Sequence, residues 1–240
     1  MTATDLTVFD ERMVGTVRST HGDLVVAPER GPSLGDGLRR AATRPELHDV
    51  LAAAGRGGPA TERTLDLAGL RLEVERRPDP WDGFRSRVSR GRVTGIGPGH
   101  DGEVVAGFAD LLSVSTSGER RMYYRLLVRG ESGSAHVVEG VKHLDGPLGQ
   151  AWRQTTTLYT RVSAVPDSCR LGEDGLEADD QLRRLSERLV ALRPVAAGTL
   201  RVRPSDLGAQ LRSVHGRGAC RFALGFVRRV LLPSLGRARG

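Results

Sequence analysis

Lysine occurs once in this chain, at position 142, although the chain has 36 basic residues. Lys142 lies in a β-rich run, where it shares one side of a strand with Val138 and Gly140. If that side points into an apolar interior, the lysine needs a partner or a ligand anion. Gly140 would then leave room for a ligand, so Lys142 is the first candidate for a functional site.

A hydroxyl-rich run, Thr-Thr-Thr-Leu-Tyr, is the second polar feature. Read as a strand, it puts Thr155, Thr157 and Tyr159 on one face. Threonine favours strands, so one interpretation is a solvated β surface. The other is that the hydroxyls line a pocket.

Tyr124 alternates with Met122 and Leu126 in a strand-like run and could complete the wall of that pocket. Two hypotheses follow, a ligand-binding interior and a small enzyme with an acid/base set made by Lys142, Tyr124 and the threonines. The candidate ligand-binding residues are Tyr124, Lys142, Trp152, Thr155, Thr157 and Tyr159.

Other chemistry finds little support in the sequence. Residues 97–102 match G-x-G-x-x-G, but a strand-like run follows, whereas a dinucleotide site needs a helix there. We therefore expect a turn. The chain has no G-x-S-x-G and no P-loop, and its six histidines are scattered. We predict no metal site and no cofactor.

The elements that would position these residues are mainly strands. Five β-rich runs, separated by turns at roughly ten-residue intervals, predict an antiparallel meander; they are residues 91–96, 103–115, 120–129, 135–144 and 155–162. Further strands are expected at 13–18, 23–27, 64–75 (with a bulge at Gly69) and 198–203, and helices at 45–54, 81–88, 177–192, 204–214 and 219–232. The predicted fold is mainly β (α+β), barrel-like or sandwich-like, with C-terminal helices. We expect two parts, a β-rich barrel-like domain at 1–204 and a basic helical segment at 205–240 packed on or beside it.

The net charge of +7 is confined to the end of the chain. Residues 207–240 hold seven arginines and no Asp or Glu, which leaves 29 basic and 29 acidic residues in the remainder. A neutral body argues against nucleic-acid binding. The basic helix has three interpretations: docking on the barrel or capping its mouth, contact with a partner protein, or contact with a membrane surface. Its candidate contact residues are Arg221, Phe222, Phe226, Arg228 and Arg229.

Cysteine usage and the N-terminus predict the compartment. Two cysteines fit a reducing environment, and the first residues carry neither the basic nor the apolar segment of a signal peptide. No apolar run approaches the roughly 20 residues of a membrane span. We expect a cytoplasmic protein, with the basic helix allowing peripheral membrane contact.

Several motifs follow one another in an order that is difficult to match by chance. The series M-x-Y-x-L, G-x-K and W-x-x-T-T-T-L-Y runs from Met122 to Tyr159. It is accompanied by F-D-E-R-M-V-G at 9–15, and by A-G-T-L-R-V and P-S-D-L-G-A-Q-L at 197–202 and 204–211. Together these stretches resemble the accessory β-rich module attached to actinobacterial cholesterol-oxidase-like GMC flavoproteins and their α/β-hydrolase neighbours.

That resemblance implies a role but not a reaction. The flavin and hydrolase domains are absent from these 240 residues, so their activities do not transfer. The expected function is a non-catalytic binding module for an apolar, sterol- or lipid-like ligand, acting beside a flavin oxidase or hydrolase. The alternatives are the small enzyme described above and a structural or interaction protein held at a membrane by its C-terminal helix.

Overall fold

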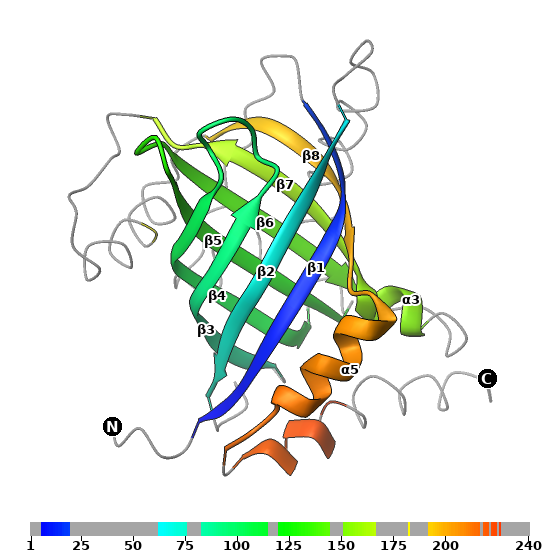
Figure 1. The fold of residues 1–240 in the computed structure, drawn as a ribbon. Coiled ribbons are helices and arrows are strands. Elements are labelled where there is room, and N and C mark those ends of the chain that lie inside the picture. Colours follow the sequence, from blue (N-terminus) through cyan, green and yellow to red (C-terminus); the bar gives the residue numbers. More distant parts are fainter. Residues whose placement is uncertain are drawn as a thin grey trace.

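A computed structural model shows a closed barrel of eight antiparallel strands (Figure 1). It describes residues 6–19, 62–75, 83–114, 120–144, 151–166, 192–216, 218–220 and 222–224, and the single positions 182 and 226. The strands are β1 (Thr7–Ser19), β2 (Glu62–Val74), β3 (Phe84–Thr94), β4 (Gly102–Val114), β5 (Arg120–Gly130), β6 (Ala135–His143), β7 (Thr157–Ala164) and β8 (Arg193–Arg201). Helices α3 (Ala151–Thr156) and α5 (Pro204–Ser213) accompany them.

Each strand pairs with the next along the chain, and β8 returns to pair with β1. This closure leaves no free sheet edge in the barrel. The predicted mainly β fold is confirmed, and of the two architectures left open, barrel or sandwich, the chain forms the barrel. The bulge expected near Gly69 is also confirmed, because the β2–β3 register shifts between Ala68 and Arg71 and Gly69 has a φ of 59°.

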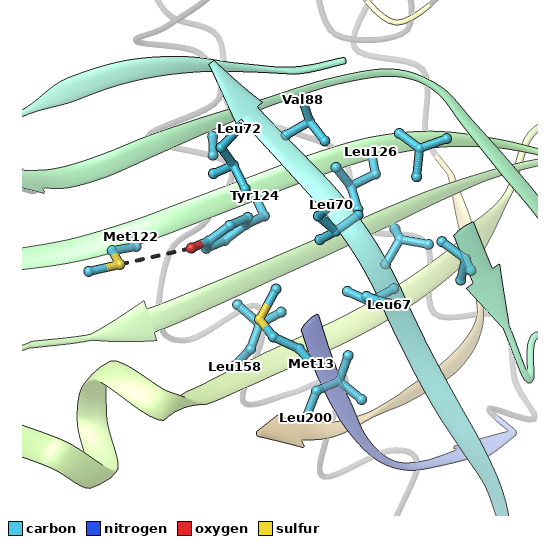
Figure 2. Packing of buried hydrophobic residues seen from close by; sticks show 14 of the residues in the cluster. Met13, Leu67, Leu70, Leu72, Val88, Met122, Tyr124, Leu126, Leu158 and Leu200 are labelled. Carbon is cyan, nitrogen blue, oxygen red and sulfur yellow. Dashed lines mark hydrogen bonds between the residues drawn. The ribbon is translucent and has the colours of Figure 1, made fainter. Parts of the chain in front are cut away.

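Alternation along the strands sends apolar side chains into the barrel. On β2, for example, Leu65, Leu67, Leu70 and Leu72 are all fully buried. They join side chains from each of the other seven strands in one interior cluster, part of which Figure 2 shows. Eight-stranded barrels are just wide enough to be filled by side chains or to hold one small ligand.

The C-terminal segment lies against one end of this barrel. Helix α5 packs on β1, and the Ser213 hydroxyl accepts a hydrogen bond of 2.9 Å from the Asp10 backbone N–H. Beyond it, Phe222 is 9% exposed and stacks on Phe9, with ring centroids 5.7 Å apart. Phe84 meets the same ring edge-on at 5.3 Å. Phe222 therefore covers the end of the barrel where β1 begins.

Two predicted elements were wrong. Residues 81–88 were expected to be helical, but Phe84 begins strand β3. Residues 155–162 were expected to form one strand, but the chain is helical up to Thr156 and β7 begins at Thr157. The predicted strand at 23–27 and helix at 45–54 lie outside the described residues, as does most of the helix expected at 177–192.

Candidate functional site

Three side chains form a charged group inside the barrel, which we call the interior triad: Glu11, Tyr124 and Lys142. The Lys142 amino group donates to Glu11 Oε1 over 2.6 Å. The Tyr124 hydroxyl donates to Glu11 Oε2 over 3.0 Å. The Lys142 nitrogen also lies 5.1 Å from the centre of the Tyr124 ring. All three residues are buried, so the group is an ion pair with a hydroxyl in an apolar interior.

Strand alternation places each member of the triad. Tyr124 lies between Met122 and Leu126 on the inward face of β5, with its hydroxyl toward the Met122 sulfur (Figure 2). Lys142 pairs with Met122 in the β5–β6 register. Glu11 comes from β1, whose neighbours in the barrel are β2 and β8 and not β5 or β6, so its contacts with Tyr124 and Lys142 cross the interior. Lys142 and Tyr124 therefore both lie on the inner side of the barrel, which is the side that a ligand pocket would require.

Burial controls the protonation of the tyrosine. Burial raises the pKa of Tyr124 well above its ordinary value, and the charge and hydrogen bond of Glu11 raise it further. The hydroxyl is therefore a hydrogen-bond donor at neutral pH and not a source of tyrosinate.

Small residues surround Tyr124 in the adjoining strands. One row of paired positions runs Ser86, Ala109, Tyr124, Gly140 and Thr160. Ser86 alternates with Phe84 and Val88 of the interior cluster, and its buried hydroxyl has no hydrogen-bond partner in the structure. A buried hydroxyl without a partner costs free energy, and a hydrogen bond from Ser86 to a polar ligand atom or a water would remove that cost.

Gly140 does not by itself leave an open space. The Leu158 side chain lies over it, so closely that a Cβ at position 140 would come within 2.7 Å of Leu158 Cδ2. The glycine is required for this close packing. Any ligand at the triad has Leu158 as a neighbour.

The hydroxyl-rich run does not join the triad. Thr155 and Trp152 belong to helix α3, and nothing further is described for the Trp152 side chain. Thr157 and Tyr159 alternate with Leu158, which faces inward, and so lie on the outer face. Tyr159 is 36% exposed. The structure thus brings Tyr124 and Lys142 together and places Thr157 and Tyr159 on the opposite face, while Thr155 belongs to helix α3.

A second buried charged group lies on the outer face of β5, β6 and β7, and we call it the outer cluster: Tyr123, Arg125, Glu139 and Arg161. Glu139 accepts hydrogen bonds from the Tyr123 hydroxyl (2.6 Å), Arg125 Nη1 (3.0 Å) and Arg161 Nε (2.6 Å). Leu127 of β5 and Val137 of β6 lie on the same face and pack with Leu182 in a second apolar cluster. Arg125 and Arg161 both pair with Glu139 in the strand registers, so the cluster joins neighbouring strands.

The arginines dominate the electrostatics of the outer cluster. Burial alone would raise the pKa of Glu139, but Arg161 and Arg125 outweigh it and lower that pKa to about 2. For Tyr123, burial and the Glu139 charge raise the pKa above its ordinary value. Two guanidinium groups bond to the Glu139 carboxylate, and two nitrogens of Arg125 have no hydrogen-bond partner among the described residues.

The residues expected to make membrane or partner contacts are only partly described. Phe222 is buried at the barrel end, and Phe226 is partly buried beside it with ring centroids 6.2 Å apart. Arg221, Arg228 and Arg229 lie outside the residues whose side chains are described. Within the described parts of the chain, no helix is long and apolar enough to cross a membrane.

The glycine-rich motif at 97–102 is a turn, as predicted. Asp101 Oδ1 accepts hydrogen bonds from the backbone N–H groups of Gly95 (2.8 Å) and Ile96 (2.9 Å). Strand β4 follows directly, so no helix N-terminus faces this loop. His100 and His136 pack edge-on near the turn, but the described residues contain no group of three or more potential metal ligands.

Two residues of the site were not predicted from the sequence. Glu11 received no role, although it stands between Phe9 and Met13 at inward-facing positions of β1. Ser86 was assigned to a helix. In both cases an alternating apolar pattern with one polar member was the available signal.

No family model, curated protein or solved structure matches this chain. The motif resemblance to the flavoprotein-associated module is therefore a basis for proposals only.

Proposed function

We propose that the barrel is a non-catalytic binding module for an apolar, sterol- or lipid-like ligand held in its interior beside the triad. The observation that carries this proposal is an ion pair buried in an apolar barrel. A buried ion pair is a weak stabiliser, since apolar residues of similar volume often serve as well. Its presence in the interior is better explained by a ligand that needs a polar anchor.

The surroundings of Tyr124 support the same proposal. The row from Ser86 to Thr160 offers small side chains next to the tyrosine, and the Ser86 hydroxyl has an unused hydrogen bond. Ligand sites are typically apolar with a few placed polar groups, and this wall has that composition.

The enzyme hypothesis has less support. Of its candidate threonines, Thr157 lies on the outer face of β7, whereas Lys142 lies inside the barrel, and Thr155 belongs to helix α3. The raised pKa of Tyr124 keeps its proton in place at neutral pH, which suits binding better than proton transfer.

Native mass spectrometry of the protein from its own host tests the binding role directly. We expect a co-purifying apolar molecule, and a rise in melting temperature when sterols or lipids are added. The variant Ser86→Leu fills the proposed site without removing a hydrogen bond, so it should fold and lose this response. Thr16→Leu, at an exposed outer position on β1, is the matched control and should respond like the parent. If Ser86→Leu binds like the parent, the ligand is not in the interior.

The partner proposal rests on the motif resemblance. The module would deliver or hold a ligand for a flavin oxidase or hydrolase. In a reconstituted assay with a cholesterol-oxidase-like flavoenzyme from the same host, we expect added module to raise turnover of a poorly soluble substrate. An equal effect of Ser86→Leu would make the stimulation independent of the barrel interior.

Peripheral membrane contact is a second candidate, favoured by the surface of the C-terminal segment. Leu211 and Leu224 are 65% and 71% exposed, in a segment with seven arginines and no acidic residue. We expect the chain to float with vesicles containing anionic lipid and not with neutral ones. Leu224→Ser should weaken flotation, whereas flotation that ignores lipid charge would contradict this candidate.

A further inference from the structure

The charge balance of the interior triad points to the chemistry of the ligand. Lys142 is directly neutralised by Glu11 at 2.6 Å, and Tyr124 adds a neutral hydroxyl. A ligand carboxylate would gain the attraction of Lys142 and meet the repulsion of Glu11 at the same place. The free energy of removing the carboxylate from water would therefore not be offset by a net electrostatic attraction. A ligand ammonium would meet the same balance with the signs reversed.

The unused hydrogen bonds of the triad favour a group that both donates and accepts. Lys142 has three N–H donors, and its hydrogen bond in the structure goes to Glu11. The Glu11 carboxylate has lone pairs beyond those used by Lys142 and Tyr124. A hydroxyl can accept from the amino group and donate to the carboxylate, whereas a carbonyl can only accept. An alkane satisfies neither.

We propose that the barrel selects apolar ligands that end in an uncharged hydroxyl, against the corresponding carboxylates and amines. This inference rests on the proposed function and narrows its ligand class. Glu11 acts as the residue that excludes anions, because it neutralises the charge of Lys142, which would otherwise attract them. The interior triad is thus a specificity device in addition to an anchor.

A matched series of twelve-carbon compounds tests the inference on the full-length chain. Dodecanol, dodecanoate, dodecylamine and dodecane compete with the neutral fluorescent probe N-phenyl-1-naphthylamine at pH 8, below micelle-forming concentrations. We expect dodecanol to bind at least tenfold more tightly than dodecanoate and dodecylamine, and more tightly than dodecane.

Two charge variants should change this order in opposite directions. Glu11→Gln leaves Lys142 without its counter-charge, so dodecanoate should gain at least tenfold relative to dodecanol. Lys142→Met leaves Glu11 unpaired, so dodecylamine should gain instead. Glu103→Gln removes an exposed carboxylate from the outer face and should leave the order unchanged. If either single variant does not fold, the double variant Glu11→Gln/Lys142→Met removes both charges together. It should reduce the advantage of dodecanol over dodecane.

The outcomes separate the inference from the proposed function. If the probe and all four compounds fail to bind, the binding role itself is wrong. If the parent protein binds but prefers dodecanoate, or if Glu11→Gln leaves the order unchanged, the binding role stands and the hydroxyl preference is overturned.

Discussion

Two consecutive tyrosines on β5 enter two different buried charged groups. Tyr123 donates to Glu139 on the outer face, and Tyr124 donates to Glu11 inside the barrel. The outer cluster joins directly paired residues of three neighbouring strands, whereas Glu11 reaches Lys142 across the interior. The first arrangement reinforces a sheet that already exists. The second links strands that are not neighbours in the sheet, and this difference supports the proposed ligand in the interior.

The basic residue also differs between the two regions. The outer cluster uses arginine, which stays charged in proteins and has several fixed donors. The interior uses the chain's one lysine, a compact charge with three donors that pairs with a single carboxylate. Substitutions of the two glutamates should therefore have unequal costs.

The largest expected effect is that of Glu139→Gln. It removes the carboxylate to which Arg125 and Arg161 both bond, and breaking a buried pair in this way costs about 3–5 kcal/mol. Urea unfolding followed by circular dichroism measures the loss. Glu103→Gln on the exposed face is the control and should change the unfolding free energy by less than about 0.5 kcal/mol. A loss from Glu139→Gln as small as that control would mean that the outer cluster does not stabilise the sheet.

Acid should act on the same cluster. The folded pKa of Glu139 is lowered to about 2, while an unfolded glutamate titrates near 4.3. Its contribution is present above the unfolded pKa and is lost as the pH falls through the folded one, with a total of at most roughly 3 kcal/mol. Urea midpoints between pH 5 and pH 2.5 should fall in the parent, and less steeply in Glu139→Gln. Equal slopes would assign the acid sensitivity to other carboxylates.

Phe222→Ala tests whether the C-terminal segment closes the end of the barrel near the triad. Removing a ring packed against Phe9 and Phe84 should cost about 2–3 kcal/mol, below the usual core value because the site is at an end. It should also speed exchange of an interior probe, measured by stopped-flow fluorescence. The variant Leu224→Ala changes an exposed neighbour and should alter neither quantity. Unchanged exchange in Phe222→Ala would place the ligand's route elsewhere.

Glu11→Gln should cost less than Glu139→Gln, about 2 kcal/mol, because Glu11 pairs with one basic group whereas Glu139 pairs with two. Paired urea titrations of the two variants at pH 7 measure this contrast. A penalty equal to that of Glu139→Gln would mean that the two regions are equivalent structural ion pairs.

The sequence predicted one half of the interior triad for a physical reason. Strand alternation is local, so Lys142 and Tyr124 could be assigned to one side of their strands without knowing the fold. Glu11 could not be linked to them, because its contact spans 131 residues and exists only once β8 closes on β1. The alternation of Phe84, Ser86 and Val88 was present in the predicted helix at 81–88 and was overlooked.

The hydroxyl-rich run shows the opposite limitation. The predicted alternation holds for Thr157 and Tyr159 but not for Thr155, which is helical, and the direction of a face is set by the tertiary structure. Leu158 and Val162 are apolar and face inward, which sends Thr157 and Tyr159 outward. Meander and turn spacing thus predicted an antiparallel barrel or sandwich, while the choice between them and the site depended on closure.

The smallest expected effects belong to the two tyrosines, and they compare the regions most directly. Tyr123→Phe and Tyr124→Phe each remove one hydroxyl and leave the ring, so each should cost about 1 kcal/mol in unfolding free energy. Their effects on ligand binding should differ. Tyr124→Phe removes a donor from the proposed anchor and should weaken dodecanol binding severalfold, whereas Tyr123→Phe acts on the other face of the strand and should leave binding unchanged. Because the two residues are adjacent and the substitutions identical, a difference in binding at equal stability would come from the side of the strand alone. Equal binding by both variants would remove Tyr124 from the site.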